Sequence, residues 1–221
     1  MKWIYIAAGA ILFIKMLVFP SPGIDSSAEL AIVVTVVQES GVPNAVSGII
    51  FRFRLYDTIF EVVVFTIAIM GARFLLADEQ PSGKVYQFTD QPSIVLARLG
   101  ATIAALVCVE LAIRGHLSPG GGFAAGVAGG TAIGLIAITS PSAWMESVYQ
   151  RWRAATWEKV SVLIFIVIAL LSLLGLSLPP QELGTLLSGG WIPLLNVLVA
   201  VKVALGSWAA ILIFIRYRGL L

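Results

Sequence analysis

The sequence predicts an all-α, polytopic membrane protein with six transmembrane helices, two in a front part and four in a rear part, plus a short interfacial or re-entrant helix. Composition is the first observation behind this prediction. Of the 221 residues, 59% are hydrophobic and only 12% are charged, whereas an ordinary soluble domain is roughly 25% charged. The mean hydropathy of +0.98 also indicates a membrane protein. A soluble globular domain is therefore excluded.

Charge and the scarcity of reactive side chains exclude further classes. There are 14 Lys and Arg residues against 12 Asp and Glu, a formal net charge of +2, which is not the basic surface that nucleic acid requires. Cys108 is the single cysteine and His116 the single histidine. An internal disulfide, a thiolate cluster and a site with several imidazoles are all excluded. We expect no metal, no cofactor and no nucleic-acid partner.

Six apolar stretches are long enough to span a bilayer. A spanning helix needs about 17–25 mostly apolar residues, because the hydrocarbon layer is ~30 Å thick and each helical residue rises ~1.5 Å. The stretches are Trp3–Phe19, Thr58–Ala77, Ile94–Ile113, Gly122–Thr139, Val160–Leu178 and Leu194–Ile215. The first resembles a secretory signal, but Lys15 interrupts it and no small-residue cleavage site precedes Pro20, so we expect a retained helix.

The segments between the spans define the predicted modules. Ser21–Asp57 contains Ala45–Phe51, an apolar run too short to cross, which predicts the interfacial or re-entrant helix. Asp78–Gln91 is polar and contains proline and glycine, as in a solvated linker. We therefore expect a two-helix module over residues 1–80, a linker over 81–93 and a four-helix module over 94–221.

Basic residues predict the orientation, since cytoplasmic loops are enriched in Lys and Arg and an even number of spans places both termini on one side. The side of the membrane on which both termini are predicted to lie has nine basic residues: Lys2, Arg73, Lys84, Arg98, Arg151, Arg153, Lys159, Arg216 and Arg218. The opposite loops hold Arg52, Arg54 and Arg114. Both termini should therefore face the cytoplasm.

Two carboxylates mark the second span. Asp57 and Glu61 are four residues apart, which places them side by side on one helix face. Repulsion and partial desolvation favour the neutral form of at least one acid, which suits a group that takes and releases protons. The alternative is structural, with Asp57 as the N-cap before Thr58 and Glu61 hydrogen-bonded in the first turn.

The later spans carry further charges. Glu110 and Arg114 have the spacing of a helical ion pair, which serves either as an anchor or subunit contact or as part of a proton route. Lys202 lies well inside its span, where a charge costs about 2.5–3.5 kcal/mol. Asn196 is on another stripe of that helix, so the partner of Lys202 must come from another helix or another chain. The alternative for Lys202 and Lys15 is snorkelling to the interface.

A glycine-rich turn separates the third and fourth spans. Residues 115–123 read Gly-His-Leu-Ser-Pro-Gly-Gly-Gly-Phe, in which proline and glycine break the helix. His116 either handles protons near pH ~6–7 or hydrogen-bonds locally. Gly120, Gly122 and Ala125 fit a loose dinucleotide-binding pattern, but no strand is expected before them, so we reject nucleotide binding.

Four glycines continue from this turn along the fourth span. Gly122, Gly126, Gly130 and Gly134 recur at four-residue spacing, which exposes a groove of bare backbone along one face of a helix. This pattern predicts a closely packed helix, whose partner comes either from this chain or from another.

The same residues carry a resemblance to a known family. The segment 115–123 closely resembles the signature of the MnhB/MrpB subunit of multisubunit Na+/H+ antiporters. The likeness extends over about Asp90–Leu221, with the Ser93–Leu99 lead-in and the late Ile192–Asn196 followed by Lys202.

The front part resembles a different unit. Asn44–Ile49, Arg54–Glu61 and the residues up to Gly71 are similar to the MbhE-like module, which ends the large A subunit of many antiporters and is a separate small subunit of membrane-bound hydrogenases. The resemblance therefore implies that the two modules are fused here. Phe51-Arg52-Phe53 departs from the family, which usually has an acidic residue before its arginine.

The resemblance implies an accessory membrane subunit of an Mrp-type antiporter, a complex related to respiratory complex I that exchanges internal Na+ for external protons. Its partners would be large complex I-like antiporter subunits, small membrane subunits and the lipid of a bacterial cell (inner) membrane. Na+ and H+ would be transported ions rather than cofactors. Glu61 is the first candidate for a proton or cation relay, followed by Lys202, Asp57, Glu110 and His116, whereas Pro119, Gly120, Gly121 and the glycine groove are structural.

We weigh two alternatives to this function and do not expect a complete carrier. A membrane-bound hydrogenase or sulfur-reducing complex shares these modules, and the neighbouring genes would distinguish it. A stand-alone intramembrane enzyme would use Asp57 and Glu61 as an acid pair, but no nucleophile is paired with a base and one histidine cannot supply a zinc site, so we expect no enzyme. A complete carrier would show an internal repeat, which the two halves lack.

Overall fold

The computed structural model describes residues 2–18, 26–81, 85–179 and 181–218. These residues form helices connected by turns, with no strand among them, which confirms the all-α class. The chain divides into two compact units, Met1–Val36 and Val37–Leu221. Phe19, where the first predicted span ends, and Lys84, one of the predicted cytoplasmic cations, lie outside the described residues.

The first unit holds α1 and most of α2. Helix α1, Lys2–Val18, covers the first predicted span. Helix α2, Ser26–Ser40, was not predicted. Its apolar run from Ala31 to Val37 is bounded by Glu29 and Glu39, and it is too short on its own to be recognised as a span. By composition, residues Glu29–Ser40 and Ala45–Phe53 together have the apolar length of one broken span or a re-entrant loop.

Four helices of the described residues are long and apolar enough to cross a membrane, or up to five if the bent pair counts as one span. They are α4 (Leu55–Leu76), α5 (Gln91–Arg114), α8 (Ala154–Leu173) and α9 (Ile192–Arg218). Helix α6, Gly122–Ala137, is apolar but has only 16 residues. The chain is therefore a multi-pass membrane protein, and the count of six spans stays a prediction.

The observed helix ends correct two expectations. Helix α4 begins at Leu55, so its N-cap is Arg54 and not Asp57; the carboxylate of Asp57 instead contacts the Arg54 guanidinium within the first turn. Helix α8 begins at Ala154 and ends at Leu173, earlier at both ends than the predicted Val160–Leu178. The earlier start brings Glu158 inside the span. An acidic residue just before the predicted span is therefore part of an apolar helix long enough to cross a membrane.

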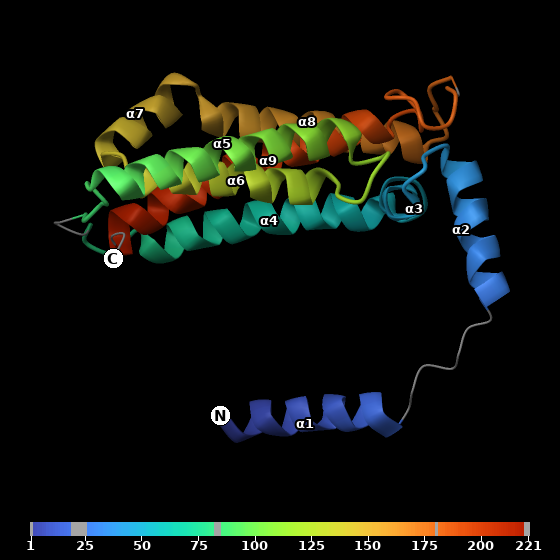
Figure 1. Ribbon diagram of the computed structural model, residues 1–221, viewed down its shortest axis with the longest axis horizontal. Coiled ribbons are helices and arrows are strands. Elements are labelled where there is room, and N and C mark those ends of the chain that lie inside the picture. The colour runs from blue at the N-terminus through green and yellow to red at the C-terminus, as the bar shows by residue number, and fades with distance from the viewer. Residues whose placement is uncertain (1, 19–25, 82–84, 180, 219–221) are drawn as a thin grey trace. The chain divides into compact units, whose positions relative to one another are not determined.

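Helix α9 is the centre of the second unit. It packs against α4, α5, α6 and α8, and Figure 1 shows these helices running side by side. Helix α7, Ser142–Arg151, was not predicted; it lies at the end of the bundle that carries the C-terminus, and α3 lies at the opposite end. The buried residues form two clusters along α9, one around Leu195 and Val199 and the other around Trp208 and Ile213.

The glycine groove of α6 is filled by α9, so its partner comes from this chain. A Cβ atom added at Gly122 would lie 2.5 Å from the backbone oxygen of Asn196, and one at Gly130 would lie 2.7 Å from Cβ of Ser207. At Gly126 the added atom would overlap Val203. The predicted close packing is confirmed over these three glycines. Gly134, whose Cβ would lie 3.6 Å from Ile211, makes only ordinary contact.

The glycine-rich turn between α5 and α6 is hydrogen-bonded to the segment that precedes α4. Gly120 and Gly121 have φ of 148° and 125°, which glycine adopts without strain. The predicted short helix over Ala45–Phe51 is present as α3, Ala45–Gly48, followed by a π-helical turn, Ile49–Phe53. Asn44 caps α3, and its Nδ2 donates to the backbone oxygens of Gly115 (2.8 Å) and Ser118 (2.7 Å).

Candidate functional site

A buried ion pair in the middle of the bundle is the main candidate site. Lys202 of α9 is 1% exposed, and its Nζ lies 3.4 Å from Oε1 of Glu158 on α8. The same ammonium lies 4.0 Å from the ring centroid of Phe65 on α4, a cation–π contact. The partner of Lys202 therefore comes from another helix of the same chain. The alternative of a lysine snorkelling to the interface is wrong, because the ammonium is enclosed by three helices.

The neighbouring backbone makes room for this pair. Gly206 follows Lys202 by one turn of α9, and a Cβ atom there would lie 3.3 Å from Oε1 of Glu158 and 2.7 Å from Cε1 of Phe65. A larger residue at Gly206 would thus push the carboxylate or the ring out of place. Glu158 is slightly less enclosed than its partner, since its side chain is 10% exposed against 1% for Lys202.

Stability alone does not explain such a pair. Replacing a buried ion pair with apolar residues is often neutral or stabilising, because removing two charges from water costs about as much as their attraction returns. A pair of this kind is accordingly weak evidence for stability, and ionisable residues inside membranes mark ion or proton pathways. Glu158 and Lys202 are functional candidates on this ground.

Sequence reasoning missed Glu158. It precedes the predicted start of its span, Val160, by less than one helical turn, which is within the usual uncertainty of helix ends. A signal was present, because a lysine deep in an apolar helix requires an acidic partner from another helix. Allowing each predicted helix one more turn would have placed Glu158 among the candidates.

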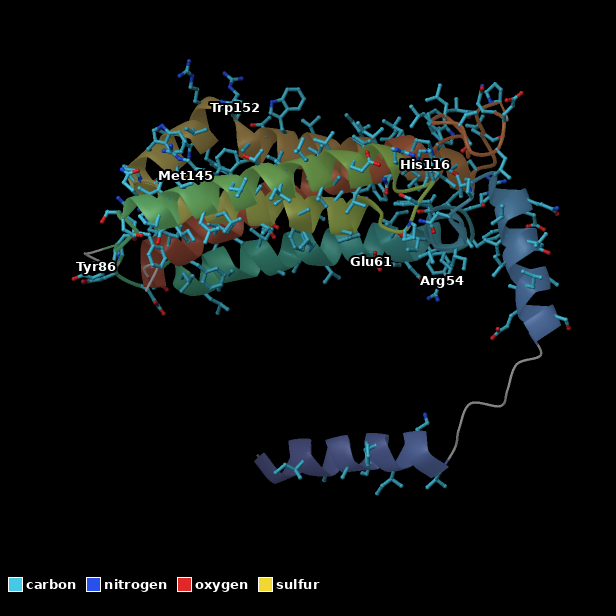
Figure 2. The ribbon with its side chains drawn as sticks, viewed as in Figure 1. Arg54, Glu61, Tyr86, His116, Met145 and Trp152 are labelled. Atoms are coloured by element: carbon cyan, nitrogen blue, oxygen red, sulfur yellow. The ribbon has the colours of Figure 1, made fainter. Side chains whose placement is uncertain are left out.

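The two carboxylates of α4 have different surroundings. Asp57 forms an ion pair with Arg54 in the first turn, whereas Glu61 is exposed on the outer side of α4, as Figure 2 shows. Its neighbours Phe60 and Val64 are 65% and 61% exposed, so the carboxylate lies on an apolar outer face. Since Asp57 already has a cationic partner, the two acids do not form the isolated like-charged pair that their spacing predicted.

Glu110 and His116 are not part of the Lys202–Glu158 site. Oε1 of Glu110 is 3.2 Å from Nη1 of Arg114, which confirms the predicted ion pair, and both side chains are more than half exposed. His116 is fully buried in the glycine-rich turn, and neither ring nitrogen has a hydrogen-bond partner among the described residues. Burial lowers the pKa of His116, while the nearby backbone of Thr185 and Leu186 opposes the shift. His116 is therefore neutral at pH 7.

A cavity of about 530 Å³ opens at the end of the bundle that carries the C-terminus. Its lining includes Arg73 of α4, Glu146 and Tyr149 of α7, and Ala209 and Arg216 of α9. Within the described part of the chain, no three His, Cys, Asp or Glu residues come close enough to hold a metal ion. The polar groups of this cavity are therefore candidates for binding water, protons or small ions.

Comparison with known proteins identifies the family. A family model described as "Domain related to MnhB subunit of Na+/H+ antiporter" matches residues 92–209, which is more than half of the chain. A membrane-embedded helical bundle with an internal ion pair is the class of protein that the structure defines. Within that class, this chain belongs to the MnhB-related family. No curated protein matches.

Two solved structures have the same fold. One is "the membrane-bound sulfane sulfur reductase (MBS), an archaeal respiratory membrane complex", with 24% identity, a TM-score of 0.70, and coverage of 98% of this chain and 99% of that chain. The other is the Mrp complex from Dietzia sp. DQ12-45-1b, with 20% identity, a TM-score of 0.65, and coverage of 95% of this chain but only 25% of that chain. Both matches extend over the front and rear parts together, while the fusion of two modules stays a prediction.

Proposed function

We propose that this chain is an accessory subunit of a multisubunit Mrp-type Na+/H+ antiporter, in which it contributes helix packing and part of a proton or cation relay. Membership of the MnhB-related family supports the kind of complex. The relay rests on one observation, the ion pair between Lys202 and Glu158 in the centre of the bundle. The chain would work with large antiporter subunits and small membrane subunits, and it would have no enzymatic activity of its own.

The buried pair can exchange protons without a large change in net charge. Transfer of a proton from Nζ of Lys202 to Oε1 of Glu158 converts an ion pair into a neutral amine and a neutral acid. In a low-dielectric interior the two arrangements differ less in free energy than they would in water, because burial disfavours both charges. A charge that arrives in a neighbouring subunit would then shift the balance between them.

The remaining predicted relay residues have positions at the surface or ends of the bundle. Glu61 lies on the outer face of α4, where it would meet a neighbouring subunit, while Asp57 and Glu110 are held by Arg54 and Arg114. His116 is enclosed in the turn after α5. We assign Glu61 to exchange with a partner and leave the other three as secondary members of the relay.

Location and orientation follow from the distribution of charge. Arg73, Arg151 and Arg216 belong to the end of the bundle with the C-terminus, whereas Arg54 and Arg114 belong to the opposite end. The positive-inside rule assigns the first end to the cytoplasm. We propose on this basis that the C-terminus is cytoplasmic and, from the even number of predicted spans, that the N-terminus is as well. The family resemblance further leads us to propose a bacterial cell (inner) membrane and Na+ and H+ as transported ions.

A second candidate is a subunit of a complex I-related respiratory complex, such as a membrane-bound hydrogenase or sulfur reductase. The observation in its favour is length, because this chain and the sulfane sulfur reductase chain match over almost all of both. In the Mrp complex the matching region is a quarter of a longer chain. Iron–sulfur and hydrogenase-like proteins encoded nearby, or purified with the chain, would favour this candidate.

The decisive experiment removes the ion pair without leaving a buried charge. The double variant Lys202→Met/Glu158→Leu keeps two apolar side chains of similar size, so the complex should assemble. We expect Na+-dependent proton exchange in membrane vesicles to fall by about tenfold or more, the effect of ~1.4 kcal/mol on a barrier. Exchange at the wild-type rate in the assembled double variant would remove the pair from the relay.

A further inference from the structure

The cavity at the C-terminal end of the bundle shares a face of α9 with the buried pair. Lys202, Gly206, Ala209, Ile213 and Arg216 recur on α9 at the spacing of one helix face. The last three line the cavity, and the backbone at Gly206 adjoins the carboxylate of Glu158. Because each helical residue rises ~1.5 Å, Gly206 and Ala209 are only ~4.5 Å apart along the helix axis. The carboxylate thus lies about one turn from the inner end of the cavity.

Tyr149 belongs to the same cavity. It comes from α7, lines the cavity and is otherwise buried, with 6% exposure. Its ring packs edge to face against Trp208 of α9, with the ring centroids 5.3 Å apart and an interplanar angle of 79°. Trp208 follows Lys202 along α9 and packs in the same buried cluster as Tyr149. Tyr149 therefore connects the cavity lining to the buried cluster along α9.

Trp208 also carries an unpartnered donor. Its Nε1 is buried and has no hydrogen-bond partner among the described residues. Buried polar groups of this kind are usually satisfied by ordered water. Because Trp208 packs against Tyr149, which lines the cavity, we expect cavity water to be the source of that partner.

We propose that this cavity is the aqueous entrance to the Lys202–Glu158 pair, and that the Tyr149 hydroxyl passes protons between cavity water and the Glu158 carboxylate. The proposal rests on the relay function proposed above and adds its route. In each step a hydronium ion of the cavity water gives a proton to the Tyr149 oxygen, while the Tyr149 hydroxyl proton moves on through an intervening water to a carboxylate oxygen of Glu158, so that neutral water is left in the cavity. No group is oxidised or reduced, and the net change is one proton gained by Glu158.

The charges around Tyr149 suit a proton donor that stays protonated. Burial raises the pKa of the Tyr149 phenol, the negative charge of Glu158 raises it further, and Arg73 opposes the shift. The charged or titratable groups of the cavity are Arg73 from α4, Glu146 from α7, and Arg216 and Tyr217 from α9. Nη1 of Arg216 lies 4.0 Å from Oε1 of Glu146, so these two partly neutralise each other at the cavity wall. Tyr149 therefore keeps its hydroxyl proton at neutral pH and can pass it inward.

The first test removes only the hydroxyl group. Tyr149→Phe retains the ring and its packing against Trp208, so the complex should assemble. We expect the rate of Na+-dependent proton exchange to fall about tenfold, a barrier change of ~1.4 kcal/mol, with the Na+ concentration for half-maximal rate unchanged. A structural role for the ring would leave the rate intact in this variant.

The second test blocks the cavity. In a Cys108→Ser background, Gln150→Cys places a thiol on the cavity lining, and Ser147→Cys places one on the exposed surface of the same helix. A bulky charged methanethiosulfonate reagent, applied to the side that carries Arg216, should abolish exchange in the first variant and leave it intact in the second. Release of the adduct by a reducing agent should restore exchange.

Both results are needed for the proposal. Full exchange in Tyr149→Phe, or in the modified Gln150→Cys variant, would overturn the route through this cavity. In either case, loss of exchange in Lys202→Met/Glu158→Leu would still support the buried pair, so failure of the entrance is distinguishable from failure of the proposed function.

Discussion

Glu158 and Glu61, two acidic residues of the membrane helices, have opposite surroundings. Glu158 faces inward, where Lys202 neutralises it and Phe65 covers the ammonium. Glu61 faces outward among exposed apolar side chains. A bilayer penalises a charge in either place, and among the described residues the structure gives Glu158, but not Glu61, a cationic partner. The fold thus completes the inner ionic site by itself, whereas for the outer one we have proposed completion by a neighbouring subunit.

The largest expected effect is on stability and comes from breaking the inner site. Lys202→Met alone, or Glu158→Leu alone, leaves one buried charge without its partner, which typically costs about 3–5 kcal/mol. The double variant should be close to wild type. Thermal unfolding of the detergent-purified complex measures the difference. Equal losses in the single and double variants would mean that packing, and not charge, accounts for the loss.

The next largest effect is expected from the helix contact that holds Lys202 in place. Gly126→Leu would drive a side chain into Val203, the residue after Lys202, and Gly130→Leu would drive one into Ser207. Overpacking of this kind costs about 1–3 kcal/mol or more, so the complex should be lost on a native gel. Gly134→Ala is the matched control, because its Cβ would make an ordinary contact of 3.6 Å. An intact complex in Gly126→Leu would contradict the close packing of α6 on α9.

A smaller effect is expected from pH at the glycine-rich turn. Burial lowers the pKa of His116 from its ordinary value of 6.5, so the unfolded chain binds a proton more readily than the folded chain. The stability due to neutral His116 is therefore present above pH 6.5 and declines as the pH falls below that value. Unfolding temperatures at pH 7.5 and 5.5 should differ more for the wild type than for His116→Asn. Equal differences would show that other groups cause the acid sensitivity.

The contrast between these sites also shows what the sequence could predict. Four of the apolar spans, the Glu110–Arg114 pair and the glycine contact follow local spacing, which survives folding, and the structure confirms them. The partner of Lys202 could not be named, because it depends on which helices pack against α9 and on where α8 begins. Helix α7 was missed since its mixed, short pattern carries no span signal, yet it brings Tyr149 to the cavity. Tertiary neighbours, rather than local periodicity, decide these features.

The smallest effect on stability, and the sharpest test of the comparison, is expected at Glu61. Glu61→Gln removes a charge that has no ion-pair partner in the described part of the chain, so the unfolding free energy of the isolated chain should change by less than about 0.5 kcal/mol, as for most surface substitutions. Na+-dependent proton exchange by the complex should nevertheless be abolished or sharply weakened, because the amide cannot take up a proton. Glu110→Gln is the matched control, since it also removes an exposed carboxylate of a membrane helix, and it should leave most of the exchange intact. If both variants exchange at the wild-type rate, the outward carboxylate has no part in ion transfer, and the relay is confined to the inner pair. If only Glu61→Gln fails, the outer site requires a titratable group at a subunit contact, which is the role that its exposure on α4 predicts.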